Sequence, residues 1–353
     1  MVAPAPTPRT EIVAFRSEHQ DLVARFSERV WQRPRSAAFL HWRYFEHPNH
    51  HAYLALRANE CLCMVGAFRR PYRVGERTIV VSDSFDWYSL PELRGSGLGV
   101  RLLQRMMKDP EPVIVTGGSA DTRDLLPRMR FQIPGSVARF GMLLGAERAA
   151  GLIAGRTRLP RALGRLAFLL SRPLLAPRVR AAPPGGSVAV VAKLSDEALA
   201  IDPRPGGRGT APIWTPAYLS WLGAGSPAMG RYVPLEFRAG GALVGWALLR
   251  IYETASGRDA ALLDVRARVP SDATYTWLVS EIAVYARREG CGLLTAGTSC
   301  PHVEAGLRAN RFHAFTPAPI HYAANDGAVL EAPVVFGAHW GDEPILPYPT
   351  GEW

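Results

Sequence analysis

Residues 87–103 read WYSLPELRGSGLGVRLL, and this stretch decides the fold of the chain. It joins a strand-like run at 78–88 to an amphipathic, helix-like run at 98–108 through a loop with glycine at every second position from 95 to 99. Glycine lets a backbone approach an anion closely, and the free N–H groups in the first turn of a helix favour negative charge. The loop therefore predicts a phosphate-binding site.

The spacing of these glycines separates the loop from two common phosphate-binding motifs. A dinucleotide-binding loop would need glycine or alanine at position 100, which is Val100. A P-loop would end in Gly-Lys-Ser or Gly-Lys-Thr, and the stretch contains no lysine. What remains is Arg-Gly-x-Gly-x-Gly after a strand, beginning at Arg94. A plain strand-turn-helix junction is the alternative interpretation, because such junctions also favour glycine.

With this motif, the segment from Ser89 to Gly99 resembles the acyl-CoA pyrophosphate loop of the GNAT superfamily of N-acyltransferases. The resemblance covers 11–146 in element order and is motif-specific only over 87–103. It implies acetyl-CoA or another acyl-CoA as cofactor, with the preceding strand splayed from its neighbour so that pantetheine lies in the gap. The implied pyrophosphate contacts are Arg94, Gly95, Ser96, Gly97, Leu98 and Gly99, with Ser89 and Leu90 beside pantetheine.

Acyl transfer to an amine needs a neutral attacking amine and stabilisation of the thioester oxyanion, and a general base helps. Asp83 and Asp86, on the strand before the loop, are candidate bases. Being three apart, they point to opposite faces of a regular strand, so at most one faces the substrate groove unless a bulge intervenes. Asp86 is preferred because GNAT proteins often carry an acid there. The alternative for either residue is a solvated or hydrogen-bonded strand aspartate.

The sequence departs from the GNAT pattern in the next helix. Many members place a tyrosine, which protonates the CoA thiolate, a few residues before a Gly-Phe pair. Here residues 130–131 read Arg-Phe, and the tyrosine position falls on Leu126 or Pro127. Tyr88 and Ser119 are possible substitutes, and catalysis through water or a residue of the second half stays equally open. The same departure leaves room for a protein that binds CoA for regulation without transferring an acyl group.

The chain contains an internal repeat. Residues 39–42, Phe-Leu-His-Trp, match 218–221, Tyr-Leu-Ser-Trp, at a shift of 179, and proline follows at 48 and 227. Residues 130–132, Arg-Phe-Gln, match 311–313, Arg-Phe-His, at a shift of 181. The agreement in order and spacing predicts a duplicated domain.

The second copy has no glycine loop. Residues 269–272 read Val-Pro-Ser-Asp at the corresponding place. Ser271 or Asp272 suits a helix N-cap, but an aspartate would repel pyrophosphate. We therefore expect the second copy to have lost cofactor binding and to serve packing or acceptor recognition.

These patterns predict an α+β fold of two GNAT-like domains, each a mixed, mainly antiparallel sheet flanked by helices. The predicted units are an acyl-CoA-binding domain at 1–146, a basic helical linker at 147–186, and a degenerate second domain with a tail at 187–353. The stretch 145–186 holds eight arginines and one acid, Glu147. It is expected to pack on both halves; the alternative is a helix that contacts a membrane surface or a partner.

Composition narrows the class of protein. The 353 residues are 48% apolar and 20% charged, which suits a globular protein, and the longest apolar runs are too short for the ~20 residues of a membrane span. Of 41 basic residues 39 are arginine, so the net charge of +10 indicates compositional bias more than a nucleic-acid surface, and it also suits an anionic cofactor or acidic substrate. Four scattered cysteines and no leader-like N-terminus predict a cytoplasmic protein.

Three other features are weaker. The cluster at 47–51 has three histidines, but its spacing fits no standard metal site, so no metal is predicted. Cys300 near His302 suggests a thiol nucleophile, yet no third group that would orient the pair is evident. A relative that uses aminoacyl-tRNA would share the doubled architecture but would not need a CoA loop. The predicted acceptor is an amine on a small molecule, sugar or peptide.

Overall fold

The computed structural model describes most of the chain. The described residues are 9–31, 36–47, 49–156, 160–175, 180, 182–225, 230–254, 257–324, 330–331 and 333–336. Pro48 and Pro227 of the repeat, and the tail from 337 onward, lie outside them.

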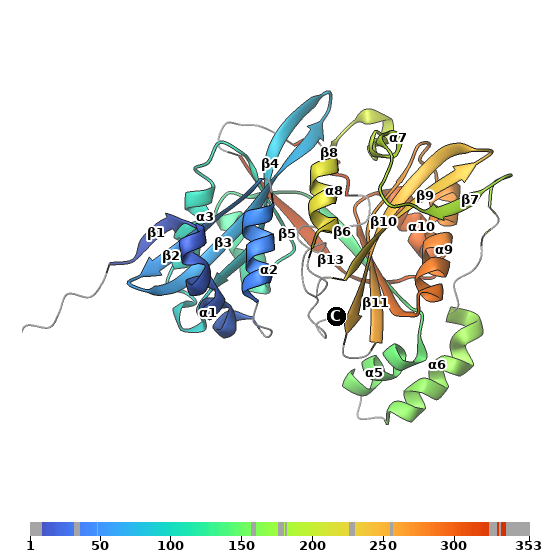
Figure 1. Ribbon diagram of the computed structural model, residues 1–353, viewed down its shortest axis with the longest axis horizontal. Helices are drawn as coiled ribbons and strands as arrows, with labels where there is room; N and C mark the ends of the chain where they lie inside the picture. Colours follow the sequence, from blue (N-terminus) through green and yellow to red (C-terminus); the bar gives the residue numbers. More distant parts are fainter. Residues whose placement is uncertain are drawn as a thin grey trace, which may run out of the picture.

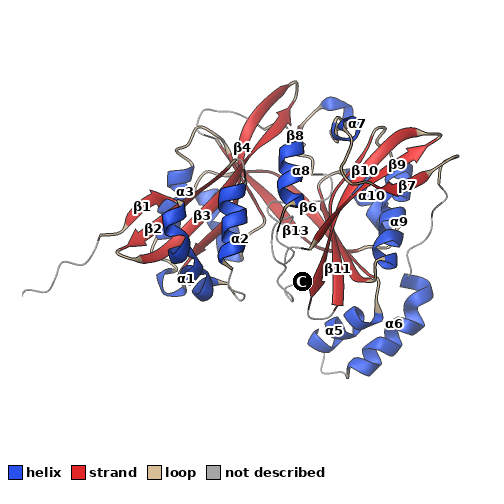
Figure 2. Cartoon of the chain, viewed as in Figure 1, coloured by secondary structure: helices blue, strands red, loops and turns tan. Residues whose placement is uncertain are grey.

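One sheet of 13 strands runs through the molecule (Figures 1 and 2). Its first-half strands are β1 (Glu11–Ala14), β2 (His50–Arg57), β3 (Glu60–Val74), β4 (Arg77–Ser89), β5 (Val113–Thr116) and β6 (Gln132–Leu143). Its second-half strands are β7 (Ser187–Val190), β8 (Thr210–Pro212), β9 (Arg231–Ala239), β10 (Ala242–Thr254), β11 (Gly257–Ala267), β12 (Cys291–Thr298) and β13 (His313–Ala323). Among these strands only the pairs β4–β5 and β11–β12 are parallel. The predicted α+β class with a mixed, mainly antiparallel sheet is confirmed.

Helices flank the sheet in both halves, as predicted. They are α1 (Gln20–Val30), α2 (Ala37–His41), α3 (Leu98–Met106), α4 (Ala120–Arg128), α5 (Ala146–Arg156), α6 (Arg161–Leu175), α7 (Asp196–Leu199), α8 (Pro216–Gly223), α9 (Asp272–Arg288) and α10 (Pro301–Ala309), with a π-helical turn η2 (Trp42–Glu46) directly after α2. Ser36, Ser119, Ser195, Thr215 and Ser271 cap five of them, each side chain accepting a hydrogen bond from an amide of the first turn.

The two halves exchange their last strands. The strand order is β1-β2-β3-β4-β5-β13-β6-β12-β11-β10-β9-β7, and β8 pairs with β3. Thus β13 of the second half lies between β5 and β6, and β6 of the first half pairs with β12. Counted inward from one edge of the sheet the order is β1-β2-β3-β4-β5-β13, and from the other edge it is β7-β9-β10-β11-β12-β6, so each strand has its counterpart at the same place. The predicted domain boundaries at 146 and 187 stay predictions, and the hydrogen bonds of β6 and β13 cross them.

The repeated tryptophans meet where the two halves join. The Trp42 indole N–H donates to the backbone carbonyl of Trp221 at 3.2 Å, and the Trp221 indole N–H donates to the carbonyl of Trp42 at 3.1 Å. Their rings stack with centroids 4.5 Å apart and an interplanar angle of 9°. A reciprocal contact of this kind is what a duplicated unit produces at its pseudo-twofold axis.

The second match of the repeat also has one geometry in both halves. Arg130 and Arg311 adopt left-handed backbone conformations with φ of 68° and 67°, which are uncommon for residues other than glycine. The following amide, of Phe131 or Phe312, donates to a carbonyl of the preceding helix at 3.1 Å in each case. This agreement supports the duplication.

Leucine substitutions at Trp42 and Trp221 should be strongly coupled. Either single change removes the stacked pair, so the double variant is expected to lose about 1 kcal/mol less stability than the sum of the two single variants. Urea unfolding of the four proteins measures this coupling. The control combines the substitution at Trp42 with one at Trp277, which lies in the core of the second half. The stability losses of these two single variants should add within about 0.5 kcal/mol in their double variant. Equal coupling in both pairs would contradict the contact's importance.

Candidate functional site

Strands β4 and β5 part beside the glycine loop. Their parallel pairing is limited to three positions, from Ser82–Val113 to Ser84–Val115. Beyond Ser84, β4 continues to Ser89 on its other neighbour, β3, and in the described structure no ladder pairing joins residues 85–89 to β5. The loop-proximal end of β4 therefore faces a gap in the sheet, as the resemblance implied.

A bulge in β4 lies where the strands part. Phe85 faces Gly66 and Tyr88 faces Met64, so Asp86 and Trp87 together oppose the single residue between them on β3. Asp86 has φ of 47°, a left-handed conformation. A bulge bends and twists its strand, which turns the end of β4 away from β5. The expected alternation of Asp83 and Asp86 between faces applies only to a regular strand, and here the bulge breaks it.

The glycine loop leaves several amides without an acceptor. Gly95 and Gly97 have φ of 81° and 77°, and a Cβ built on either would meet no atom within 4 Å. The amides of Arg94 and Ser96 are used in tight turns, and the amide of Leu98 donates to the Ser96 hydroxyl at 3.3 Å. Within the described residues, no acceptor is recorded for the amides of Gly95, Gly97, Gly99 and Val100. These exposed N–H groups at the start of α3 form a site suited to an anion.

Contacts from two directions fix the loop. The Trp87 indole N–H donates to the carbonyl of Gly99 at 3.0 Å, which ties the bulged strand to the first turn of α3. Arg29 of α1 forms ion pairs with Glu92, inside the loop, and with Glu60 of β3. Sequence reasoning missed Trp87. An indole donor on the strand that enters a glycine loop was the available signal.

The remaining residues predicted to contact CoA lie at the ends of the same loop. Ser89 donates from its hydroxyl to the Cys63 sulfur at 3.1 Å, and Leu90 is buried, with its amide bonded to the carbonyl of Leu62. Leu98 is buried against the core as the first residue of α3, while Arg94 is exposed. The loop brings the predicted set together, and its contacts with CoA stay a prediction.

The two candidate bases are both buried and bonded. Asp86 accepts a hydrogen bond from the Tyr44 hydroxyl at 2.7 Å and pairs with the Arg43 Nε at 3.0 Å. Burial, followed by the charge of Asp86, raises the pKa of Tyr44 well above its usual value, so Tyr44 stays a proton donor to that carboxylate. This arrangement favours a positioning role for Asp86 beside the bulge. Its role as a base stays a prediction.

Asp83 lies farther from the loop and is also held. It accepts from the Tyr72 hydroxyl at 2.6 Å and pairs with Arg70 Nη1 at 3.3 Å. Burial raises the pKa of Asp83, and Arg70 acts against that shift. Tyr88, the third predicted catalytic residue, is 38% exposed and packs edge-on against the Trp31 ring at 5.4 Å. It is the one member of this predicted set whose side chain reaches solvent.

The tyrosine position of the GNAT pattern holds a core residue. Leu126 is fully buried in α4, and Pro127 follows within the helix. The Ser119 hydroxyl caps this helix by accepting from the amide of Thr122 at 3.2 Å, which gives it a structural use. Neither Leu126 nor Pro127 can donate a side-chain proton.

In the second half the corresponding gap is closed by a tyrosine. Parallel pairing of β11 with β12 ends at Leu262, and β11 runs on to Ala267. The buried hydroxyl of Tyr275, from the first turns of α9, accepts a hydrogen bond from the amide of Ala267 at 3.2 Å. Ser271 caps α9, as expected. The second half therefore offers neither a glycine loop nor a free strand end.

Two sequence features are inert in the structure. Cys300 is buried, which raises the pKa of its thiol, and His302 is instead bonded to Asp272, so the thiol is not activated. In the described part of the chain, no group of three metal-ligating side chains is found around His47 or elsewhere.

His47 is a buried aromatic contact between the halves. Its ring stacks on Phe68 with centroids 4.2 Å apart and meets Trp221 edge-on at 4.5 Å. Its Nδ1 accepts from the amide of Asn49 at 3.0 Å. Burial, assisted by the charge of Arg70, lowers the pKa of His47 from 6.5 to about 3, so the imidazole is neutral in the folded protein.

This shift predicts a stability loss in acid. The unfolded chain binds a proton at His47 below pH 6.5, whereas the folded chain does so only near pH 3. The contribution of His47 to the stability of the fold is therefore complete above pH 6.5 and is lost as the pH falls toward 3. The slope is about 1.4 kcal/mol per pH unit. The free energies of unfolding of the wild type and His47→Gln, measured in urea, should therefore approach each other by about 2 kcal/mol between pH 7 and pH 5. A constant difference would contradict the buried, neutral state.

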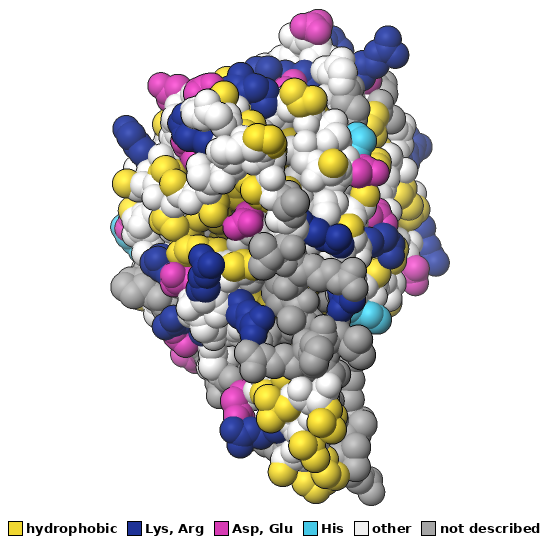
Figure 3. All heavy atoms as spheres, turned by 90° about the vertical axis from the view of Figure 1, so that its right-hand side faces the viewer, with side chains coloured by type: hydrophobic (Ala, Val, Ile, Leu, Met, Phe, Trp, Pro, Cys, Tyr) yellow, Lys and Arg dark blue, Asp and Glu magenta, His cyan; other side chains and the backbone are white. Residues whose placement is uncertain are grey.

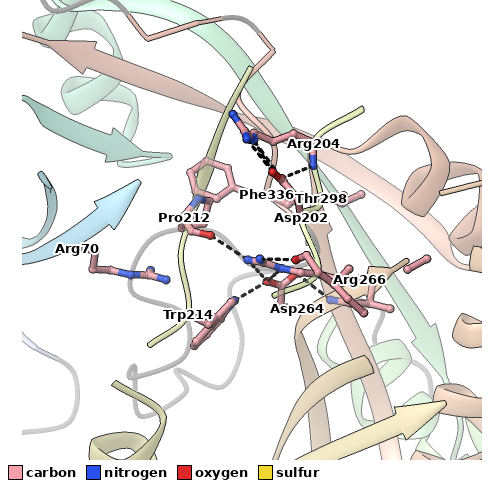
Figure 4. A network of polar contacts seen from close by, with 12 residues as sticks. Arg70, Asp202, Arg204, Pro212, Trp214, Asp264, Arg266, Thr298 and Phe336 are labelled. Carbon is pink, nitrogen blue, oxygen red and sulfur yellow. Dashed lines mark hydrogen bonds and ion pairs between the residues drawn. The ribbon is translucent and has the colours of Figure 1, made fainter. Parts of the chain in front are cut away.

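A buried polar network fixes the second half against the first (Figure 4). Asp264 accepts from the Trp214 indole and from Arg266 Nε at 3.0 Å. Arg266 also donates to the carbonyls of Ile201 at 3.2 Å and Pro212 at 2.9 Å. Because Pro212 belongs to β8, which pairs with β3, the network links β11 to the first half through β8.

A cavity of about 600 Å³ lies in the second half between α7, α8, β9 and β10. Leucine and proline make half of its lining residues, and Lys193, Asp196 and Tyr232 are among the polar ones. The equivalent space in the first half is filled by α1, which has 11 residues where α7 has four. The shortened helix explains the cavity, whose volume is in the range of small-molecule sites. This cavity was not predicted from the sequence.

Comparison with known proteins supports the fold strongly. No protein-family model matches the sequence, and no curated protein matches it. Among solved structures, Saccharomyces cerevisiae N-myristoyltransferase with bound myristoyl-CoA superposes with a TM-score of 0.62 at 12% identity, covering 91% of this chain and 86% of that one.

Two bacterial structures match over similar lengths. An Enterococcus faecalis V583 protein described as a probable N-acyltransferase gives a TM-score of 0.59 at 10% identity, over 90% of this chain and 73% of its own. A GCN5-related N-acetyltransferase from Anabaena variabilis gives 0.57 at 10% identity, over 89% and 72%. Among the described residues, no helix has the length and apolarity needed to cross a bilayer. The chain thus has the α+β fold that these solved structures share, which is the GNAT-like fold expected from its sequence.

Proposed function

We propose that the chain is an acyl-CoA-dependent N-acyltransferase whose first half binds the donor. One observation carries the proposal: the end of β4, which pairs with β3 but no longer with β5, lies beside a loop whose amides at Gly95, Gly97 and Gly99 have no acceptor among the described residues. Gly95 and Gly97 have positive φ and open space beside them, which lets an anion approach the backbone closely. The GNAT fold of the neighbours supports the same assignment.

The residues present fit the pyrophosphate of CoA. The free amides of the loop and the first turn of α3 would bind its oxygens, and the exposed guanidinium of Arg94 would add a positive charge beside them. Acyl-CoA supplies an activated thioester in this chemistry. The chain's own part is to hold the diphosphate and to order the end of β4 through Asp86 and Arg43. The second half, which has no glycine loop, is not expected to bind the same group.

The donor and acceptor are finer parts of the proposal. Acetyl-CoA is the simplest donor, and the first structural neighbour, which was solved with myristoyl-CoA, makes longer acyl chains worth testing. The acceptor is an amine on a small molecule, sugar or peptide, and the 600 Å³ cavity between α7 and α8 is the candidate site for its apolar part. A cytoplasmic location is consistent with four buried, unpaired cysteines.

A second candidate function is a protein that binds CoA without catalysis. Leu126 in place of a proton donor, together with two buried and bonded aspartates, favours it. Both candidates need the same loop, so binding alone does not separate them.

Release of free CoA separates the two functions. The purified chain is incubated with acetyl-, octanoyl- or myristoyl-CoA and a panel of amines, and free thiol is followed with a chromogenic reagent. Amine-dependent release that is reduced in Tyr88→Phe and unchanged in Tyr322→Phe supports transfer with Tyr88 as proton donor. Amine-dependent release that is equal in both variants supports transfer without Tyr88. Tight CoA binding with no release on any amine supports the non-catalytic function, and the absence of CoA binding contradicts both.

A further inference from the structure

Helix α6 presents an apolar face to solvent. Leu163, Leu166, Leu169 and Leu170 are 50%, 52%, 52% and 74% exposed. Leu163, Leu166 and Leu170 recur at helical spacing on one side, while Gly164 and Phe168 are buried on the other. Figure 3 shows these yellow side chains gathered at the end of the molecule that projects from the body. We call these four leucines the α6 face.

Within the described residues, the body of the protein does not cover this face. Helix α5 is anchored to the sheet, because Arg148 Nε pairs with the buried Asp259 at 3.0 Å and Gly145 lies against Gly292. Helix α6 packs on α5 through the close approach of Gly164 to Ala150. The hairpin of α5 and α6 therefore projects from the body (Figure 1), and the four leucines of the α6 face are exposed on it. The linker was expected to pack on both halves. Helix α5 does so through its contacts with β6 and β12, whereas the α6 face does not.

The charge of the same segment selects the partner. Residues 155–178 contain six arginines and no acidic residue. Glu147, the one acid of the wider stretch, is already paired with Arg165. Four outward leucines on a helix within an arginine-rich run that contains no acidic residue have the pattern of an interfacial helix. Such a helix inserts its apolar side at the headgroup boundary while the cations attract anionic lipid.

We infer that the α6 face docks the protein on an anionic lipid surface. A second copy of the chain is the competing occupant, and the charge argues against it, because pairing two such hairpins would bring like-charged arginine runs together. The inference does not depend on acyl transfer, since the α6 face lies outside the loop and the gap beside β4.

Vesicle co-sedimentation tests the inference with a matched pair of variants. The full chain is mixed with vesicles of phosphatidylcholine alone or of equal parts phosphatidylcholine and phosphatidylglycerol. Leu166→Ser with Leu170→Ser removes two residues of the α6 face, and Ile133→Ser with Val269→Ser removes two aliphatic side chains of similar exposure, 55% and 71%, from the body. Size-exclusion chromatography with light scattering gives the oligomeric state of each protein.

The expected result is binding to the anionic vesicles only, weakened about tenfold or more in the α6 variant, unchanged in the body variant, and reduced by added salt. Three results would overturn the inference: no binding to anionic vesicles, equal binding by the α6 variant, or a dimer of the wild type that the α6 variant dissociates. The last would assign the face to a second copy. Because all four substitutions are at exposed positions, a folded variant is expected in each case.

Discussion

Replacing Gly97 by aspartate should weaken CoA binding about a hundredfold. Gly97 has φ of 77° in open space, so a side chain fits sterically but adds about 1 kcal/mol of backbone strain. The new carboxylate would stand among the amides that hold the diphosphate, and repulsion between like charges at such a distance costs about 1–4 kcal/mol. The strain is present with and without CoA, so it lowers only the stability of the fold. A repulsion of about 2.7 kcal/mol, within the stated range, corresponds to two factors of ten in affinity. Isothermal titration calorimetry with CoA measures it.

Gly207→Asp is the matched control for this substitution. Gly207 has a closely similar φ of 73°, also with no atom within 4 Å of a built Cβ, and lies in the second half near Arg204. It should carry the same backbone strain and the same added charge, yet leave CoA affinity unchanged. Equal affinity of Gly97→Asp and wild type would remove the glycine loop from the account of the cofactor site.

Replacing Arg266 by methionine should destabilise the protein by about 3–5 kcal/mol. Arg266 and Asp264 are both buried in the network of Figure 4, and methionine leaves the carboxylate without its cation and the carbonyls of Ile201 and Pro212 without a donor. Breaking one side of a buried ion pair is costly because the remaining charge stays in a poorly solvating environment. Thermal or urea unfolding measures the loss.

Arg268→Met is the control two residues away. Arg268 pairs with Glu197, but both side chains are about half exposed, so the exposed pair is worth about 0–1 kcal/mol. Adding Asp264→Leu to Arg266→Met should recover part of the stability, because the unpaired charge is then gone. Similar losses in Arg266→Met and Arg268→Met would contradict the role of the network in joining the two halves.

Local signals in the sequence predicted much of the fold. The order of strands and helices in each half follows from hydrophobic period and turn residues, and the glycine spacing at 95–99 predicted a loop with exposed amides before a helix. The repeat of Trp42 in Trp221 predicted a duplicated unit, and in the structure these two rings contact each other. The strand, helix and loop predictions used residues close together in the chain, and the repeat needed only the comparison of two short segments.

Features that depend on distant partners could not be predicted. The exchange of β6 and β13 between the halves cannot be predicted from local sequence, because the residue pattern of a strand does not determine which strand it pairs with. The bulge at Asp86 likewise follows from its register against β3. Burial of the candidate bases depends on Arg43, Tyr44, Arg70 and Tyr72, which come from other elements. A carboxylate in a strand looks the same in sequence whether it meets substrate or an arginine.

Amide hydrogen exchange with and without CoA tests the central claim most directly. The account holds that the amides of Gly95, Gly97 and Gly99 meet a diphosphate, so saturating CoA should slow their exchange strongly while residues 269–272 of the second half stay unchanged. Unaltered exchange in the glycine loop when CoA is bound, or protection that appears only in the second half, would contradict it.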